Sequence, residues 1–577
     1  MTEEIKKFLT EKIRREFAAC GIPAECNCKI PEDVFITMRD GVRLHTWICF
    51  PDSAREKFPV ILTRTCYPDN EFMYRIYGEE LARRGYGFAW QYVRGREQSE
   101  GDWIPNIYER NDGIDTVCWL AMQPWCEILG YWGHSYTAMA GWAMADAVEG
   151  KVASMYLEDY GTDRFVSAYE KGAFRHDVLT SWSMENGPVP VNDGYEKFLE
   201  SCRYMPQREV DEKLWGCRND SYREYIGSPK ENDPLWQSGW WKELREIPSK
   251  TVIPVCVVSG WYDHHHGSSM NTWRSLSDAA KKHGWLRIGA WNHFFEPCTP
   301  GREIANLRPE EMPEMIAWFE LTLKKKKLPE PKVCFYLIGG DRWIEKSTWE
   351  TRGQEERSYY FGNGMQDVEE GYVGALLEKE TFTGKEKGNI SWGYCYHPAD
   401  PVPTVGGEGL LKTKWQIGSL QQPEAGYRSD VLSFQSLPLE KDLVILGKIQ
   451  VELYVSSDCE DTAFTAKVME VTPEGKAYNI RSSITTIGED ILEGKKYEIG
   501  MVTKVTISMW DIAYMVKAGN RLRIDISSSD FPQYNIHSNC AGLWSDQTHS
   551  RPAYQKIYAG ADYPSRMVLP IMPKYLT

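Results

Sequence analysis

Three side chains of the types that together activate a hydroxyl group follow one another along the chain: Ser135, Asp263 and His293. A serine hydroxyl is a weak nucleophile at neutral pH, and it needs an imidazole that accepts its proton. The imidazole needs a carboxylate that fixes its tautomer and stabilises its charged form. These residue types therefore match nucleophilic acyl transfer, provided that the fold brings them together.

Ser135 stands between a short apolar run, residues 128–132, and a segment of small, helix-favouring residues. A turn of this kind between a strand and a helix holds the nucleophile of doubly wound hydrolases, in which the acid and the histidine come later in the chain. The strict pattern Gly-x-Ser-x-Gly is not met, because Thr137 takes the place of the second glycine. Taken alone, Ser135 fits an ordinary helix N-cap as well as a nucleophile.

Asp263 and His293 each lie at the end of an apolar segment, at residues 251–263 and 285–294. Parallel sheets gather ligands and catalytic groups at the carboxyl ends of their strands. Either residue alone is more often structural than catalytic. The joint occurrence of a serine, an aspartate and a histidine at strand ends in this order predicts a triad of Ser135, Asp263 and His293.

The elements that must position this triad alternate between strand and helix patterns. Residues 58–67 and 152–160 are apolar runs typical of buried parallel strands. Residues 70–84 and 111–125 have helical spacing. Alternation of this kind favours a doubly wound, mostly parallel sheet with helices on both faces.

The character of the sequence changes at three points, which predicts four segments. The stretch 161–248 is rich in Trp, Tyr, Glu and Asn and predicts a helical insertion, and the charged run "LKKKKLPEP" at 323–331 predicts a linker. Short alternating runs beyond it are typical of a β-sandwich or jelly roll. We expect a first part of the α/β domain at 1–160, a cap at 161–248, a second part at 249–331 and a β domain at 332–577.

Composition narrows the class of protein and its partners. The formal net charge of -15 argues against a nucleic-acid partner, because binding a phosphate backbone relies on clustered Lys and Arg. We expect no membrane segment, since no apolar run approaches the roughly 18 residues that a spanning helix needs. The N-terminus lacks the apolar core of a secretory signal, and the 15 scattered cysteines indicate reduced thiols and a cytoplasmic location. The sequence does not decide the oligomeric state, and a homodimer is compatible with it.

Several motifs also carry a resemblance. The chain resembles the serine hydrolase family of bacterial cocaine esterases and glutaryl acylases, which is related to the X-prolyl dipeptidyl peptidases, over roughly residues 30–577. The matching stretches are "VRGREQSEGDW" (93–103), "DGIDTVCWLAMQPWC" (112–126), "GHSY" (133–136), "GWYD" (260–263), "WNHF" (291–294), "YHPADPVPTVGG" (396–407), residues 454–480 and residues 521–539. The resemblance implies an α/β-hydrolase domain, an inserted helical cap and a C-terminal jelly roll.

The resemblance also implies the chemistry of the site. It assigns the triad to Ser135, Asp263 and His293, and the oxyanion hole to the hydroxyl of Tyr67 and the backbone N–H of Tyr136. Two such donors must point at the developing oxyanion, and loss of one typically costs about 10²–10³ in rate. The implied activity is hydrolysis of a small ester or amide through an acyl-enzyme, without a cofactor.

Some positions depart from the family pattern. Tyr92 stands where relatives usually have an aspartate, and we expect a rearranged structural contact there. Asp263 is followed by three histidines, residues 264–266, where relatives that act on α-amino acid esters have acidic residues. Adjacent residues point in different directions, so three in a row seldom form one metal site, and we expect no metal.

The substrate pocket is the least defined part of the prediction. We expect His265 or His266 to line the acyl pocket, and Tyr169 and Trp182 to form its aromatic walls. The alternatives are an amide acylase, an X-Pro dipeptidyl peptidase and a non-catalytic protein whose β domain binds ligands. A peptidase needs a negative pocket for a free N-terminus, for which the candidates are Glu158, Asp159, Asp163 and Glu170. A binding protein would have a degraded triad, and here all three residue types are present.

Overall fold

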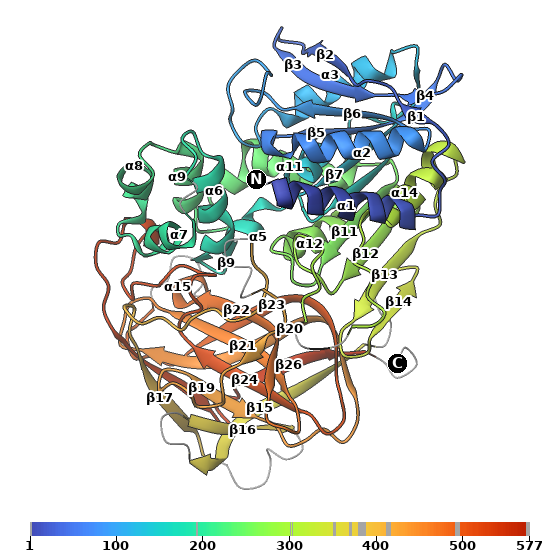
Figure 1. Cartoon of the computed structure of the whole chain (residues 1–577). Coiled ribbons are helices and arrows are strands. Elements are labelled where there is room, and N and C mark those ends of the chain that lie inside the picture. Colours follow the sequence, from blue (N-terminus) through green and yellow to red (C-terminus); the bar gives the residue numbers. More distant parts are fainter. Residues whose placement is uncertain are drawn as a thin grey trace.

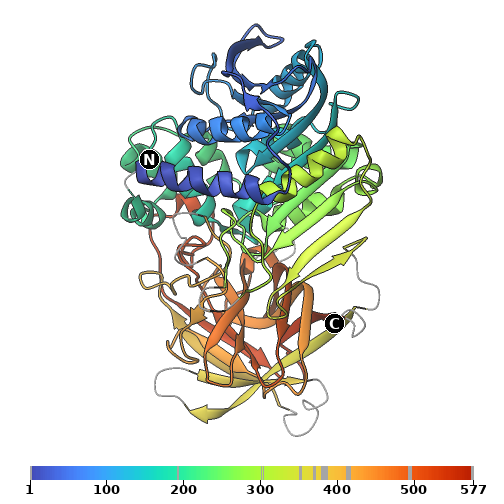
Figure 2. The same cartoon turned by 45° about the vertical axis from the view of Figure 1, so that its right-hand side comes forward.

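Two large sheets organise the chain (Figure 1). The structure is a computed structural model that describes residues 3–191, 194–299, 302, 304–349, 354–367, 372–378, 388–410, 417–490 and 497–572. The first sheet has ten strands in the order β14-β13-β12-β11-β8-β7-β5-β6-β3-β2, and the second has twelve strands from the C-terminal part. Both views place the second sheet below the first (Figures 1 and 2).

Parallel strands fill the middle of the first sheet. They are β5 (Phe58–Thr65), β6 (Gly87–Tyr92), β7 (Cys126–His134), β8 (Val152–Glu158), β11 (Val255–Gly260), β12 (Trp285–Gly289) and β13 (Lys332–Leu337). Antiparallel strands close the edges: β2 (Glu32–Thr37), β3 (Arg43–Cys49) and β14 (Arg342–Lys346). Strands such as β5 and β11 are buried at every residue because helices cover both faces.

Two groups of helices make this covering. One group packs together as α1 (Glu3–Ala19), α2 (Glu71–Arg83) and α14 (Met312–Phe319), which η4 (Glu320–Lys324) continues. The other group comprises α3 (Glu109–Ala121), α4 (Tyr136–Trp142), α11 (Gly239–Lys250), α12 (His266–Ser275) and, further along, α13 (Asp278–Lys281). The sequence expectation of a doubly wound α/β-hydrolase sheet is confirmed.

The cap lies between β8 and β11 and is mostly helical. Its elements are α5 (Arg164–Ala168), β9 (Tyr169–Glu170), β10 (Ala173–Phe174), η2 (His176–Thr180), α6 (Ser181–Asn186), α7 (Gly194–Arg203), η3 (Gln207–Glu209), α8 (Val210–Leu214), α9 (Asp220–Ile226), α10 (Pro234–Gln237) and α11. The pair β9–β10 is a small antiparallel hairpin that the sequence did not indicate. In Figure 1 the cap stands beside the first sheet and reaches the C-terminal domain.

The C-terminal domain is the predicted jelly roll. Its strands are β15 (Glu355–Asp367), β16 (Tyr372–Glu378), β17 (Ile390–Tyr396), β18 (Gln421–Gln422), β19 (Leu432–Gln435), β20 (Leu443–Ser457), β21 (Ala463–Val471), β22 (Ala477–Thr486), β23 (Thr503–Val516), β24 (Arg521–Ser527), β25 (Ala553–Ala559) and β26 (Arg566–Ile571). Their pairing is antiparallel except between β16 and β19. Buried and exposed residues alternate along β25, as expected for a sheet with one face on a core.

The first sheet continues past the expected boundary at residue 331. β13 pairs in parallel with β12, and β14 pairs with β13, so both strands belong to the hydrolase sheet. An apolar run such as 332–337 suits either kind of sheet, and the proline-containing linker before it suggested a break. The linker instead returns the chain from η4 to the sheet edge.

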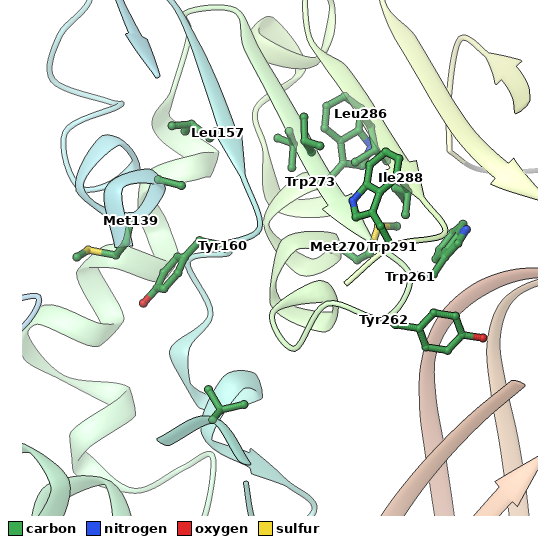
Figure 3. Close-up of a cluster of buried hydrophobic side chains, with 14 of the residues drawn as sticks. Met139, Leu157, Tyr160, Trp261, Tyr262, Met270, Trp273, Leu286, Ile288 and Trp291 are labelled. Carbon is green, nitrogen blue, oxygen red and sulfur yellow. The ribbon is translucent and has the colours of Figure 1, made fainter. Parts of the chain in front are cut away.

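The two sheets and the cap share one continuous apolar core. Figure 3 shows the part of this core around the ends of β11 and β12, where Trp261, Tyr262 and Trp291 are labelled. The hydroxyl of Tyr262 reaches the carbonyl of Ile480 in β22 at 3.5 Å, so this cluster links the two domains. Within the described residues, no helix has the length and apolarity that crossing a membrane requires.

Candidate active site

Ser135 occupies a strained turn between β7 and α4. Its φ of 57° and ψ of -126° lie outside the regions that L-residues prefer, which costs about 1–3 kcal/mol. Its amide donates to the carbonyl of Glu158 at 2.9 Å, and its side chain makes no N-cap hydrogen bond. A Cβ at Gly133 would lie 2.4 Å from the Thr137 carbonyl, so the turn requires glycine there. These features argue against the N-cap alternative.

Thr137 closes this turn in a different way from a glycine. Its hydroxyl accepts from the amide of His134 at 2.6 Å and donates to the carbonyl of the same residue at 2.8 Å. Thr137 and Ala138 both lie within α4, where negative φ makes a glycine unnecessary. The departure from the strict glycine pattern therefore leaves the elbow intact.

The three predicted residues come together in one hydrogen-bonded chain. His293 Nε2 lies 2.9 Å from Ser135 Oγ, and His293 Nδ1 lies 2.5 Å from Asp263 Oδ2. The second carboxylate oxygen of Asp263 accepts from the amide of His265 at 2.7 Å. Asp263 and His293 are buried, whereas Ser135 is partly exposed. A buried carboxylate that orients an imidazole toward a serine is the arrangement that activates the hydroxyl.

Sequence reasoning missed His134 as a supporting residue. Its Nε2 lies 2.8 Å from the backbone carbonyl of His293, and the two ring centres are 4.7 Å apart. The neighbouring Asp159 is fully buried, and burial raises the pKa of its carboxyl group well above the usual range. Its Oδ1 accepts from the amide of Gly260 at 3.2 Å. The position of His134 inside the elbow motif was the signal that could have identified it.

Tyr67 and Trp182 meet beside the elbow. The indole N–H of Trp182 donates to the hydroxyl oxygen of Tyr67 at 3.2 Å, a contact that does not use the phenolic hydrogen. Burial raises the pKa of Tyr67 well above its usual range, so the group stays protonated at neutral pH. Both rings pack on Tyr136: that of Trp182 is stacked at 6.1 Å and that of Tyr67 is edge-on at 6.3 Å.

Tyr136 is the first residue of α4, and backbone amides of a first helical turn lack an intrahelical acceptor. Its side chain anchors that turn, because its hydroxyl donates to Glu109 at 2.7 Å and accepts from the amide of Asn106 at 2.9 Å. Glu109 is held in turn by buried Arg64 at 3.1 Å. The backbone of the elbow therefore rests on a buried polar network.

The three consecutive histidines have three different environments. The His264 ring packs on His293 with centres 4.3 Å apart, and His265 Nδ1 meets the hydroxyl of Ser167 at 2.9 Å. His266 Nε2 instead meets the carbonyl of Asp511 in β23 at 3.1 Å. Burial lowers the pKa of all three imidazoles well below the usual range, so they are neutral at physiological pH.

Two of the residues expected to line the pocket lie elsewhere. His266 faces the jelly roll, because the helix that begins with it turns its side chain away from His293. The Tyr169 hydroxyl donates to the carbonyl of Tyr225 at 2.9 Å and accepts from the indole of Trp544 at 3.1 Å, inside the cap interface. The structure thus corrects both expectations, whereas Trp182 and His265 lie beside the candidate site.

Metal binding and the serine chemistry exclude each other here. Ligand atoms of Asp263, His264 and His293 lie within 4.8 Å of one another, and so do those of His134, Asp159 and His293. Both groups include His293, whose nitrogens face Ser135 and Asp263. An ion in either place would take a nitrogen away from the hydrogen-bonded chain.

Comparison with known families covers most of the chain. The family described as X-Pro dipeptidyl-peptidase (S15 family) matches residues 40–295, and the X-Pro dipeptidyl-peptidase C-terminal non-catalytic domain matches residues 326–568. The cocaine esterase of Rhodococcus sp. (strain MB1 Bresler) is 28% identical over 586 residues, which cover 95% of this chain and 99% of that protein.

Two solved structures share the whole architecture. An aminopeptidase from a marine sediment archaeon, Thaumarchaeota archaeon, superposes with a TM-score of 0.78 at 19% identity, over 94% of this chain and 96% of that one. An α-amino acid ester hydrolase labelled with selenomethionine also gives a TM-score of 0.78 at 19% identity, over 95% and 97% of the two chains. At this identity the likeness shows the fold: an α/β-hydrolase domain with a cap and a C-terminal jelly roll.

Proposed function

The chain belongs to the X-Pro dipeptidyl-peptidase (S15) family of serine hydrolases, and we propose that it uses Ser135 to cleave a carboxylic ester of a small, uncharged acyl group. The observation that carries this proposal is the hydrogen-bonded chain from Ser135 through His293 to Asp263 at a strained elbow. The amide acylase of the same family uses the same steps and differs in its leaving group.

The reaction proceeds through an acyl-enzyme in two balanced halves. Ser135 Oγ attacks the carbonyl carbon while its proton passes to His293 Nε2, and Asp263 stabilises the imidazolium. His293 then gives this proton to the departing alkoxide as the ester bond breaks. In the second half a water molecule attacks the acyl-enzyme and loses a proton to His293, which returns it to Ser135 Oγ and so releases the carboxylic acid.

The oxyanion of each tetrahedral intermediate is assigned to two donors. These are the hydroxyl of Tyr67 and the backbone N–H of Tyr136, at the start of α4. Trp182 supports the first donor, because its own N–H occupies the Tyr67 oxygen and leaves the phenolic hydrogen for the substrate. Donors fixed before the reaction stabilise developing charge without reorganisation.

The acids that a peptidase would use are poorly suited to bind an ammonium group. Burial raises the pKa of Glu158 and of Asp159 well above the usual range, and that of Glu170 to about 7. Asp163 accepts a hydrogen bond from the side-chain amide of Asn271 at 3.2 Å. The neutral carboxyl groups of Glu158 and Asp159 and the neutral histidines beside His293 favour an uncharged acyl group over a free N-terminus.

We also infer a cytoplasmic location and a small-molecule substrate. All 15 cysteines are free thiols, which suits a reducing compartment. A chain with a net charge of -15 does not suit a nucleic-acid partner. A homodimer stays an open proposal, which light scattering of the purified protein would test.

Covalent labelling tests the assignment of the nucleophile. A fluorophosphonate should add one label per chain, and Ser135→Ala should abolish it, while Ser154→Ala serves as a matched control at another serine of the same sheet. A label that persists in Ser135→Ala would overturn the assignment. The substrate class is tested by measuring rates on p-nitrophenyl esters, acyl anilides and X-Pro p-nitroanilides. Each rate is divided by the uncatalysed rate of the same substrate. If this ratio is largest for an X-Pro substrate, the proposal of an esterase is wrong.

A further inference from the structure

A cavity lies between the cap and the jelly roll, apart from the candidate active site. It has a volume of about 190 Å³, and its lining does not include Ser135, Asp263 or His293. The cap contributes His176, Arg203 and Met205, and the loops of the jelly roll contribute Asn535, Ile536 and Trp544. The cavity is therefore distinct from the candidate catalytic site.

The most informative group in this cavity is the imidazole of His176. It is fully buried, and in the described part of the chain its Nε2 has no hydrogen-bond partner. Burial lowers its pKa to about 3, so the ring is neutral at physiological pH. A buried polar atom without a partner is costly, and such atoms are rare in folded proteins.

The tautomer of His176 follows from its neighbours. The side-chain amide of Gln207 donates to the Tyr222 hydroxyl at 2.8 Å, Tyr222 meets Thr180 at 2.9 Å, and Thr180 meets His176 Nδ1 at 2.7 Å. Both hydroxyl hydrogens are used only if Tyr222 donates to Thr180 and Thr180 donates to Nδ1. The hydrogen of the ring then sits on Nε2, which is an unpaired donor.

Two further donors belong to the same lining. The Arg203 guanidinium stacks over Phe531 at 4.5 Å, and its side chain stays exposed. The side-chain carbonyl of Asn535 accepts from the amide of Phe174 at 2.7 Å, so its NH₂ group is left to donate. Among the described residues that line the cavity there is no carboxyl group.

Two acids close in sequence to lining residues lie within ion-pair distance of other arginines. Asp177 lies 3.6 Å from Arg175, and Asp546 lies 2.5 Å from Arg208. Neither acid therefore competes for the guanidinium of Arg203. The wall also has an apolar part, with Met205, Ile536 and Trp544, beside uncharged polar residues such as Gln547 and Ser550.

The backbone around His176 is also unusual. Residues His176–Thr180 form a π-helical turn, η2, directly before α6. Turns of this kind are rare and occur frequently at functional sites. Here the turn directs the ring of His176 against Phe174 and Trp544, with ring centres 5.4 and 5.6 Å apart.

We propose that this cavity binds a small organic carboxylate with an apolar body. The carboxylate would accept from His176 Nε2, Asn535 and Arg203, and the apolar body would pack against Met205, Ile536 and Trp544. The acid released by ester hydrolysis belongs to this ligand class, a point that rests on the proposed function. The binding itself does not rest on it.

Titration calorimetry with sodium benzoate on the full-length protein tests the proposal. We expect saturable binding that Arg203→Met weakens about tenfold or more, because hydrogen bonds to charged groups are the strong ones. Lys213→Met removes an equal charge from an exposed position of α8 and should leave the affinity unchanged. Benzamide, the neutral counterpart of benzoate, should bind about tenfold more weakly.

A second arm separates this cavity from the catalytic site. Binding should persist after fluorophosphonate has filled the catalytic site, and His176→Phe, which keeps a ring but removes the donor, should weaken it. Thermal unfolding of each variant checks its fold. Absence of binding at about 10 mM benzoate, or binding that fluorophosphonate abolishes and Arg203→Met leaves unchanged, would overturn the proposal. If fluorophosphonate adds no label, the proposed function is wrong, but the calorimetry with benzoate still tests the cavity.

Discussion

Ser135 meets two regions of different construction. On one side, Asp263 and His293 come shortly after the ends of β11 and β12, and Trp261 and Trp291 of the same two segments belong to the buried cluster in Figure 3. On the other side, the hydroxyl of Tyr67 takes its orientation from Trp182, which belongs to the inserted cap. In the proposed reaction, residues at the sheet edge carry out proton transfer, whereas stabilisation of the oxyanion depends on a contact between the sheet and the cap.

The sheet fixes the positions of Asp263 and His293, whereas the inserted cap can change the environment of Tyr67. Strand ends of a parallel sheet lie close together whatever the loops do. A cap residue reaches the site only if the cap packs correctly against both the first sheet and the jelly roll. We expect substitutions of Asp263 or His293 to abolish the reaction. Substitutions at the contact between Tyr67 and the cap should lower the rate by smaller factors.

The largest effect should come from the sheet side. His293→Ala removes the base, and we expect kcat on a p-nitrophenyl ester to fall about 10⁴- to 10⁶-fold. His266→Phe is the matched control, since His266 faces the carbonyl of Asp511 in the jelly roll and should leave kcat near the parent's. A kcat within about tenfold of the parent in His293→Ala would remove His293 from the mechanism.

Tyr67→Phe should have the next largest effect. It keeps the ring but deletes the donor, so kcat should drop about 10²–10³-fold with KM little changed, which corresponds to roughly 3–4 kcal/mol. Tyr74→Phe removes a nearby hydroxyl that donates to Thr65 at 3.1 Å, and it should leave kcat almost unchanged. Equal kcat values for the two variants would mean that Tyr67 only packs.

Trp182→Phe should produce a smaller loss, because it removes an orienting hydrogen bond and keeps an aromatic ring on Tyr136. We expect kcat to fall about three- to tenfold, as for loss of one neutral hydrogen bond. The double variant with Tyr67→Phe should be no slower than Tyr67→Phe alone, since Trp182 acts through that hydroxyl. Additive losses in this cycle would show that Trp182 contacts the substrate directly.

The smallest expected effect concerns Asp177, a buried residue of the cap, and the pH dependence of stability. Burial raises the pKa of Asp177 to about 7, above that of an unfolded aspartate, so the folded state binds the extra proton. Stability should be highest at low pH within this range and fall as the pH rises through about 4 to 7. Melting temperatures from pH 5 to 8 should therefore fall less in Asp177→Asn than in the parent. An identical pH dependence in the two proteins would contradict the shift.

The sequence predicted the sheet side far better than the cap side. Ser135, Asp263 and His293 close apolar strands, and the geometry of a parallel sheet then brings them to one edge. The cap has no such periodic constraint: Tyr169 lies in the short strand β9 and Trp182 in the short helix α6, and only Trp182 reaches Tyr67.

The histidine run shows the same limit at the scale of one turn. Consecutive residues where a strand passes into a helix point in different directions, so His264 packs on His293 and His266 meets Asp511. A single sequence does not reveal which direction each takes. The pairing of β13 with β12 was hidden for a related reason, because an apolar strand does not reveal which sheet it joins.

The continuation of the first sheet through β13 and β14 also determines where a fragment of the hydrolase domain can end. A fragment that ended at residue 331 would leave β12 as an edge strand whose outer N–H and C=O groups lost their partners in β13. Apolar edge strands without cover pair with other chains and nucleate aggregates. A fragment that ended just after β14 would keep β12 covered, since β14 caps β13 with an antiparallel strand that carries charged Arg342, Glu345 and Lys346.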